Sequence, residues 1–247
     1  MKPYYQDDLV TLYHGDFREF DIPMGADAVI TDPPYGETSL EWDRWPNGWV
    51  EEVSRFSNTL WCFGSFRMFH EHSADFKSWK FSHEIIWKKQ NGTGFSTDKF
   101  RRVHELATLW YQGAWSEQRH DVPRVAQTSM GDKSSRTKAR GEHLGKIGDG
   151  AYVDDGTRLQ TTVIDANNEQ SRAVHPTQKP LKIISPLINY SAPVGGLVVD
   201  IFAGSGTTLL AAKLMDRRAI GFEAREKYCE AAAKRLSQQT FYVGDSE

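Results

Sequence analysis

Cysteine is scarce in this chain, which contains Cys62 and Cys229 and no others among its 247 residues. The two stand far apart in apolar stretches, without the close pairing of a zinc site. A disulfide framework is therefore excluded and no metal site is expected. Both cysteines are predicted to be reduced side chains packed in a core.

Long apolar runs and an excess of basic residues are also absent. No run is long enough to cross a bilayer, and Met1-Lys2-Pro3 does not begin a signal peptide. We therefore expect a cytoplasmic protein without a membrane partner. The formal net charge is -3, which excludes a basic coat over the whole surface, so any contact with nucleic acid must come from a local patch.

A glycine-rich segment from Asp200 to Gly206 lacks the marks of two common nucleotide sites. No lysine follows its second glycine, as a P-loop requires, and Leu209 stands where a dinucleotide fingerprint has a third glycine. An apolar run precedes the segment and a predicted helix, 207–215, follows it, which is typical of a strand, a tight turn and a helix N-terminus. The next predicted strand ends in Glu223, whose carboxylate suits the two hydroxyls of a ribose. This pattern predicts a pocket for an adenosine that needs no phosphate grip.

The tetrapeptide Asp32-Pro33-Pro34-Tyr35 follows an apolar run, 28–31, that predicts a buried strand. Its groups suit the methylation of a base amino group, whose nitrogen is a poor nucleophile because its lone pair is delocalised into the ring. The Asp32 carboxylate and the Pro33 carbonyl would each accept one amino hydrogen and localise the lone pair, while Tyr35 stacks on the base. For the tetrapeptide alone, a plain Pro-Pro turn after a strand is the alternative.

Together these motifs give the chain a resemblance to the amino-methylating DNA methyltransferases that use S-adenosylmethionine. Three further segments carry the resemblance: Gly15-Asp16, His104-Glu105 and His175-Pro176-Thr177-Gln178-Lys179-Pro180. The tetrapeptide precedes the cofactor glycines, as in the circularly permuted beta group of that family. The resemblance implies an α/β fold of the Rossmann-like class I methyltransferase type, with a doubly wound, mostly parallel sheet.

The resemblance also assigns roles to residues, and no metal ligand is among them. The catalytic residues that it implies are Asp32, Pro33, Pro34 and Tyr35. The S-adenosylmethionine site that it implies consists of Asp16, Asp32, Thr177, Lys179, Asp200, Phe202, Gly204, Ser205, Gly206, Thr207 and Glu223. The roles of Thr177 and Lys179 follow from the resemblance alone. His104-Glu105 is equally suited to bracing the sheet.

Strand-like and helix-like segments alternate along the chain, which predicts a single catalytic domain over residues 1–247. The predicted strands are 9–13, 26–31, 59–63, 84–87, 105–110, 197–199 and 218–223. The predicted helices are 49–56, 66–76, 181–190, 207–215 and 225–236.

The alternation stops between about residues 114 and 172, where Gly, Ser, Thr, Asp, Lys and Arg predominate. We predict a target-recognition insert there, because a long loop inside a compact domain is usually functional or disordered and a DNA enzyme of this net charge needs phosphate contacts somewhere. A solvated loop is the alternative. The predicted DNA-binding residues are Arg119, Arg124, Lys133, Arg136, Lys138, Arg140 and Lys146.

The predicted reaction is methyl transfer to the exocyclic amino group of adenine in double-stranded DNA, after the nucleotide flips out of the helix. In the resembling family, Asp at the first position of the tetrapeptide accompanies adenine and Ser accompanies the 4-amino group of cytosine, which is the alternative target. Methylation of RNA or of a protein glutamine fits the permuted order less well. A hydride-transfer enzyme would need the missing third glycine, and a non-catalytic nucleotide- and DNA-binding regulator would not need the tetrapeptide. Beta-group members often pair, so a homodimer is a further expectation.

Overall fold

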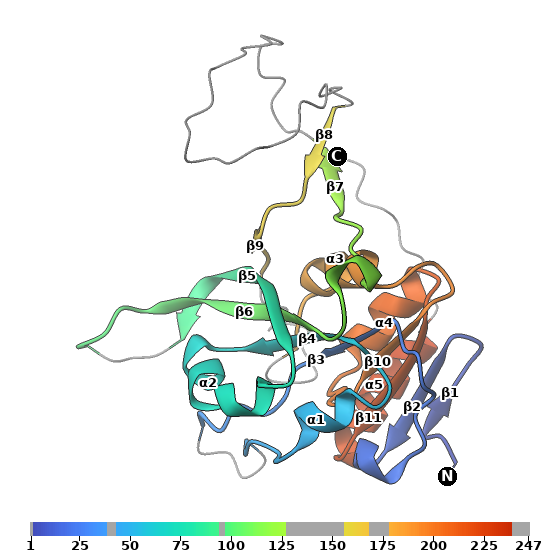
Figure 1. Cartoon of the computed structure of the whole chain (residues 1–247). Helices are drawn as coiled ribbons and strands as arrows, with labels where there is room; N and C mark the ends of the chain where they lie inside the picture. The colour runs from blue at the N-terminus through green and yellow to red at the C-terminus, as the bar shows by residue number, and fades with distance from the viewer. Residues whose placement is uncertain (1, 39–42, 94–96, 127–155, 168–177, 239–247) are drawn as a thin grey trace.

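The computed structural model describes residues 2–38, 43–93, 97–126, 156–167 and 178–238. Within these ranges one large sheet has the strand order β1-β2-β11-β10-β3-β4-β6-β5-β9 (Figure 1). The strands from β2 to β4 in this order run parallel, β6 pairs antiparallel with both neighbours, and β9 runs parallel to β5. The strands are β1 (Tyr5–Gln6), β2 (Val10–His14), β3 (Ala28–Thr31), β4 (Thr59–Gly64), β5 (Lys80–Thr93), β6 (Arg102–Tyr111), β9 (Val163–Asp165), β10 (Leu197–Asp200) and β11 (Arg218–Glu223).

The two strands that carry the sequence motifs lie side by side. In β3 and β10 every residue is buried, and the pairs Ala28 with Val198 and Val29 with Val199 set their parallel register. Since parallel strands end at the same edge of a sheet, the tetrapeptide after β3 and the glycine turn after β10 emerge next to each other. The permuted order of the motifs therefore still brings both to one edge.

Helices cover both faces of the sheet, as a doubly wound fold requires. Alternate side chains of β10 enter different apolar clusters, with Val198 on one face and Val199 on the other. The Val198 cluster contains residues of α3 (Leu181–Ser191), α4 (Thr207–Leu214) and α5 (Glu226–Ser237). The Val199 cluster contains residues of α1 (Trp49–Val53), α2 (Phe66–Glu71) and η2 (Ser73–Phe76). The predicted α/β fold class is confirmed.

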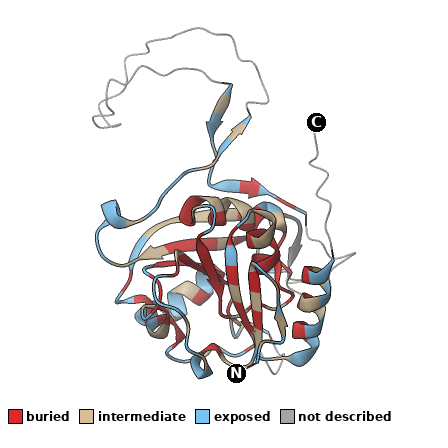
Figure 2. Ribbon diagram, turned by 90° about the vertical axis from the view of Figure 1, so that its right-hand side faces the viewer, coloured by how far each residue is buried: buried red, intermediate tan, exposed pale blue. Residues whose placement is uncertain are grey.

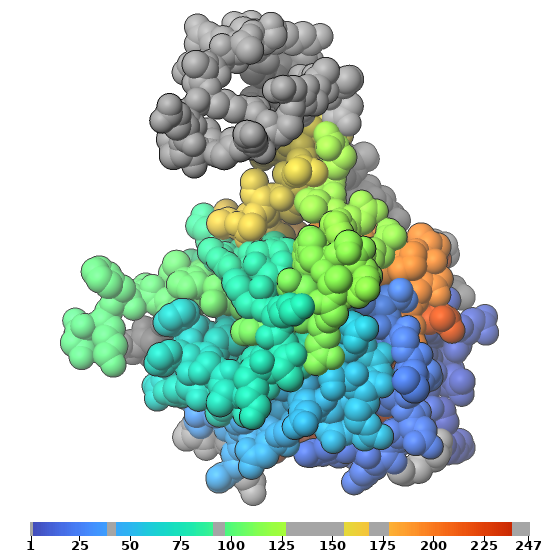
Figure 3. All heavy atoms as spheres, viewed as in Figure 1, coloured from blue at the N-terminus to red at the C-terminus, as the bar shows by residue number. Residues whose placement is uncertain are grey.

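Several predicted bounds were wrong. The helix predicted over 49–56 ends at Val53, and the helix predicted over 66–76 is split into α2 and η2 at His72. The strand predicted over 84–87 is the 14-residue β5, and that over 105–110 is the 10-residue β6. These two strands form a long antiparallel hairpin that projects from the body in the space-filling view (Figure 3).

The predicted insert contains short strands that sequence patterning missed. β7 (Arg124–Ala126) and β8 (Thr157–Leu159) form a separate two-stranded ribbon that stands away from the large sheet (Figure 1). β9 adds to the edge of the large sheet beside β5. Each has three residues, too few to show an alternating pattern. Residues 127–155 lie outside the described ranges.

The burial pattern agrees with the expected packing of the cysteines. Cys62 and Cys229 are buried free thiols, so the prediction of reduced packing residues is confirmed. Buried residues gather in the sheet and the inner faces of its helices (Figure 2).

Among the residues that the structure describes, no helix has the length and apolar character needed to traverse a membrane.

Candidate active site

A cavity of about 600 Å³ opens where β3, β10 and β11 end. Its volume lies in the range of roughly 300–1,000 Å³ that small-molecule sites occupy. The predicted site residues that line it are Asp16, Asp32, Pro33, Pro34, Tyr35, Lys179, Asp200, Phe202, Gly204, Ser205, Thr207 and Glu223. Gly206 is not in its lining, and Thr177 lies outside the described residues. One cavity thus joins the tetrapeptide to the glycine turn.

The glycine turn is shaped by two residues with positive φ. Gly204 has a φ of 50° and Gly206 one of 73°, values that favour glycine. A Cβ on Gly206 would lie 3.0 Å from the Cβ of Ala232 on α5. Gly206 is therefore required where the turn packs against α5, outside the cavity lining.

Glu223 fixes the other side of this turn. Its Oε2 accepts a hydrogen bond from the Gly204 N–H at 2.9 Å, and its Oε1 accepts one from the Arg225 N–H at 2.8 Å. Burial raises the pKa of Glu223, and these two backbone donors oppose the rise. A carboxylate oxygen that accepts one hydrogen bond can accept another, which suits the hydroxyls of a ribose.

Two other acids lie at strand ends around the cavity. Asp200 Oδ1 accepts from Thr31 Oγ1 at 2.8 Å, which ties the end of β10 to the end of β3. Burial raises the pKa of Asp200 to about 6. Asp16, just after β2, caps η1 (Phe17–Glu19) and accepts from Arg18 Nε at 2.9 Å, and Arg18 lowers its pKa. Asp200 therefore joins the two motif strands, and Asp16 borders the cavity from the end of β2.

The Asp32 carboxylate has a protein donor on each oxygen. The Tyr35 hydroxyl lies 2.6 Å from Oδ1, and Lys179 Nζ lies 2.5 Å from Oδ2. Burial raises the pKa of Asp32, Lys179 opposes the rise, and the nearby Glu105 adds to it. Lys179, predicted as a cofactor contact, thus contacts Asp32, the predicted catalytic acid, in this structure.

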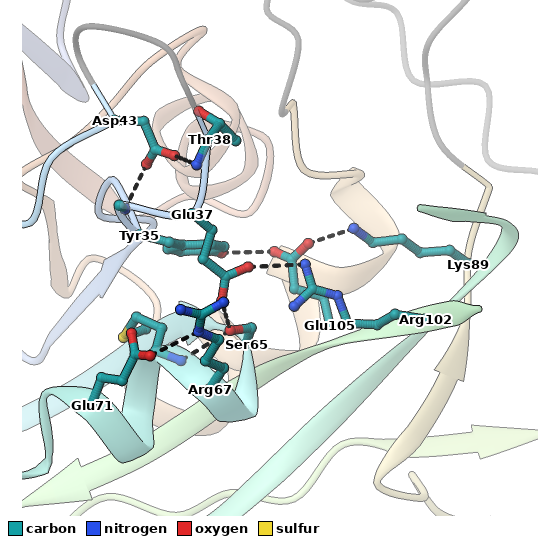
Figure 4. A network of polar contacts seen from close by, with 12 residues as sticks. Tyr35, Glu37, Thr38, Asp43, Ser65, Arg67, Glu71, Lys89, Arg102 and Glu105 are labelled. Atoms are coloured by element: carbon teal, nitrogen blue, oxygen red, sulfur yellow. Dashed lines mark hydrogen bonds and ion pairs between the residues drawn. The ribbon is translucent and has the colours of Figure 1, made fainter. Parts of the chain in front are cut away.

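Glu105 on β6 belongs to the same cluster of charges, and sequence reasoning did not place it in the site. Its Oε1 lies 2.7 Å from Lys179 Nζ and 3.0 Å from the Tyr35 hydroxyl, and its Oε2 lies 2.5 Å from Lys89 Nζ. Figure 4 shows Tyr35, Glu105 and Lys89 reaching toward one another from three segments. Burial alone would raise the pKa of Glu105, but Lys179 and Lys89 together lower it to about 2. The signal in the sequence was a carboxylate at the first position of the apolar strand predicted over 105–110.

The loop after the tetrapeptide is held by two further acids (Figure 4). Asp43 accepts from the backbone N–H groups of Gly36 at 2.9 Å and Thr38 at 2.7 Å. Glu37 pairs with Arg102 of β6 at 3.1 Å and accepts from Ser65, the N-cap of α2. Both acids border the cavity. Asp43 therefore holds the loop that forms its wall, and Glu37 connects this wall to α2 and to β6.

Two of the predicted DNA-binding residues lie in the described ranges. Arg119 pairs with Asp121 at 3.1 Å, and Arg124 on β7 donates to Thr157 Oγ1 at 2.6 Å. Arg124 is exposed, and both side chains lie outside the cavity. The other five, Lys133, Arg136, Lys138, Arg140 and Lys146, lie outside the described residues.

Comparison with protein families decides the class of the chain. Residues 26–234 match the family model N6_N4_Mtase, described as DNA methylase. The chain belongs to this family of DNA methylases. It is an amino-methylating DNA methyltransferase of the beta group, acting on adenine N6 or cytosine N4, and the methyl donor of the family is S-adenosylmethionine. The predicted family and cofactor are confirmed.

Curated relatives match over nearly the whole chain. The type II methyltransferase M2.DpnII of Streptococcus pneumoniae is 25% identical over 270 residues, covering 96% of this chain and 93% of the relative. The type II methyltransferase M.ScaI of Streptomyces caespitosus is 27% identical over 263 residues, covering 96% and 84%. Both relatives are named as type II methyltransferases, in agreement with the family.

Solved structures share the fold. The M1.HpyAVI–SAM complex has a TM-score of 0.62 at 24% identity and covers 92% of this chain and 100% of that chain. The cytosine-N4-specific PvuII DNA methyltransferase has a TM-score of 0.66 at 17% identity and covers 97% and 90%. TTHA0409 from Thermus thermophilus, complexed with S-adenosyl-L-methionine, has a TM-score of 0.56 at 19% identity and covers 91% and 93%. These likenesses support the class I methyltransferase fold.

Proposed function

We propose that this DNA methylase transfers a methyl group to N6 of adenine in duplex DNA and that Asp32 carries the reaction. The observation that carries the proposal is the single cavity in which the Asp32 carboxylate and the turn from Asp200 to Gly206 meet. The residues present fit the cofactor. Glu223 offers acceptors for a ribose, and Phe202 and Phe222 offer apolar walls for an adenine.

The residues of the tetrapeptide act on the target amino group. S-adenosylmethionine supplies, when bound, a methyl carbon on a positively charged sulfur. Asp32 and the Pro33 carbonyl accept the amino hydrogens and concentrate the lone pair on nitrogen, and Tyr35 holds the base by its face. Asp32 then takes the proton that the methylated nitrogen releases, and passes it to water. The rate acceleration comes from holding the reacting groups in position and from the two acceptors, Asp32 and the Pro33 carbonyl, that stabilise the developing positive charge on nitrogen.

We further propose that the target nucleotide leaves the helix before the reaction. Asp32 lies in a cavity that a stacked, paired base would not enter, since its amino group is held inside the duplex. Flipping costs roughly a few kcal/mol for a paired base. The aromatic ring of Tyr35 and the apolar side chains of the cavity would offset part of that cost by stacking.

Adenine is favoured over cytosine by the first residue of the tetrapeptide. In this family Asp at that position accompanies adenine, whereas Ser accompanies cytosine. The 4-amino group of cytosine is the second candidate because the same acceptors would hold it. Sequencing of DNA methylated by the purified protein tests the proposal and reports the recognition site, with modified adenines at one recurring sequence as the expected result.

The basic insert is predicted to supply phosphate contacts. Replacing Lys133, Arg136, Lys138 and Arg140 together by glutamine should weaken DNA binding and flatten its dependence on salt, by up to about one unit of slope for each phosphate interaction removed. A matched control neutralises four exposed lysines away from the insert, Lys2, Lys77, Lys182 and Lys234. The dissociation constant for DNA, measured over a range of salt concentrations, tests this prediction. If the insert variant and the control behave alike, DNA is held elsewhere.

A further inference from the structure

The proposed chemistry raises a question about Asp32, because its carboxylate must accept amino hydrogens while protein donors already occupy both of its oxygens. The Tyr35 hydroxyl lies at 2.6 Å and the Lys179 ammonium at 2.5 Å. An ammonium bonded to a carboxylate withdraws charge from it and weakens it as an acceptor for another donor. A group that received these donors when the target base arrives would make Asp32 a stronger acceptor for the amino hydrogens.

Glu105 is placed to be that group. Its Oε1 lies 2.7 Å from the same Lys179 nitrogen and 3.0 Å from the same Tyr35 oxygen that contact Asp32. Asp32 and Glu105 are thus alternative acceptors for one pair of donors. The side chains of Lys179 and Glu105 are only 7% and 11% exposed, so little water is at hand to solvate the Lys179 ammonium in place of a carboxylate.

We propose that Glu105 is a positioning residue that takes over the Lys179 ammonium and the Tyr35 hydroxyl from Asp32, which frees the Asp32 carboxylate for the target amino group. This inference rests on the proposed role of Asp32. Glu105 itself contacts neither the base nor the methyl group in this scheme. It acts through the two donors that it shares with Asp32.

The exchange needs little movement and leaves no buried charge unpaired. Lys179 Nζ is already within hydrogen-bond distance of both carboxylates, and an ammonium has three donors. An ammonium that moved away from Asp32 without a second partner would be an uncompensated buried charge, which is strongly destabilising. Lys89, at 2.5 Å from Glu105 Oε2, keeps Glu105 ionised and able to accept.

Glu105 and Lys179 are expected to shift the pKa of Asp32 in opposite directions. The charged and titratable groups that face Asp32 are Lys179 from the segment before α3, Glu105 from β6, Tyr35 from its own loop, and Cys62 and Asp200 from the neighbouring strands β4 and β10. The charge of Glu105 raises the pKa of Asp32, and that of Lys179 lowers it. Removing Glu105 should therefore shift the pKa of Asp32 down, and removing Lys179 should shift it up.

The test is the single-turnover methylation rate on duplex DNA as a function of pH, at saturating S-adenosylmethionine. In Glu105→Gln the plateau rate should fall at least about tenfold, because Lys179 and Tyr35 then stay on Asp32. The acid limb of the profile should move to lower pH. In Lys179→Met the limb should move to higher pH. The affinity of Glu105→Gln for S-adenosylmethionine, measured by calorimetry, should stay within about threefold of wild type.

Matched controls are Glu84→Gln on the adjacent strand β5 and Lys182→Met on α3, neither of which lines the cavity. Thermal unfolding of each variant identifies effects that come from misfolding. A wild-type rate in Glu105→Gln overturns the inference. So does a slower, folded Glu105→Gln with an unmoved acid limb, because a residue that merely braces the sheet would behave that way. If instead Asp32→Ala keeps its activity, the proposed function itself fails, whatever Glu105 does.

Discussion

Asp32→Ala should abolish methyl transfer, with a loss of at least about a hundredfold in the single-turnover rate, while cofactor affinity stays within about tenfold. The reason is that Asp32 is proposed to act in the transition state, whereas the segment around Gly204 and Glu223 is proposed to hold the cofactor. The structure adds a reason to expect a folded variant. Lys179 would still pair with Glu105 at 2.7 Å, so its buried ammonium would keep a partner.

The measurement pairs labelled methyl transfer with calorimetric binding of S-adenosylmethionine. Asp32→Asn is the matched variant, because it keeps the size of the side chain and removes its charge. Both variants should bind cofactor and fail to methylate. Turnover above about a tenth of wild type in folded Asp32→Ala would remove Asp32 from the reaction.

Glu223→Ala should raise the dissociation constant for S-adenosylmethionine at least about tenfold, because it removes the proposed acceptors for the ribose hydroxyls. In the wild type the Gly204 and Arg225 N–H groups donate to the Glu223 carboxylate at 2.9 Å and 2.8 Å. The substitution removes this acceptor, so the turn should also become less rigid. Glu226→Ala, at the exposed start of α5, is the matched control.

Gly206→Val should also weaken the binding of S-adenosylmethionine, but through a change in the backbone of the turn. A side chain there meets Ala232 at 3.0 Å and strains a residue whose φ is 73°, so the turn must move. Gly206→Val should also lower the unfolding temperature more than Glu223→Ala. Unchanged cofactor affinity in folded forms of both variants would separate the cofactor site from this turn.

The sequence was most informative where a strand is short, buried and bounded by a motif. The strand predicted over 218–223 has these same bounds in the structure, and the strand before the tetrapeptide ends at Thr31 as predicted. In both, a continuous apolar run and a polar residue at its end mark the strand. Because β3 and β10 pair in parallel, the motifs that follow these two strands lie at the same edge of the sheet.

The site was less predictable where it depends on contacts between distant segments. Lys179 and Glu105 are 74 residues apart in numbering (179 − 105), and nothing in either local pattern shows that one ammonium bridges Glu105 and Asp32. The local sequence around Gly206 predicted the turn, but it did not show that a side chain at this position would meet Ala232 of α5. Such contacts arise from packing across elements, which periodicity does not report.

Asp32, Pro33 and Tyr35 are proposed to direct methyl transfer to the amino group of adenine. Mass spectrometry of the nucleosides released from duplex DNA after methylation by the purified protein identifies the product. The predicted product is 6-methylaminopurine, absent when Asp32→Ala replaces the wild-type protein. Detection of 4-methylcytosine alone would contradict the assignment of the base, and a methyl group on a ring carbon would contradict the mechanism as well.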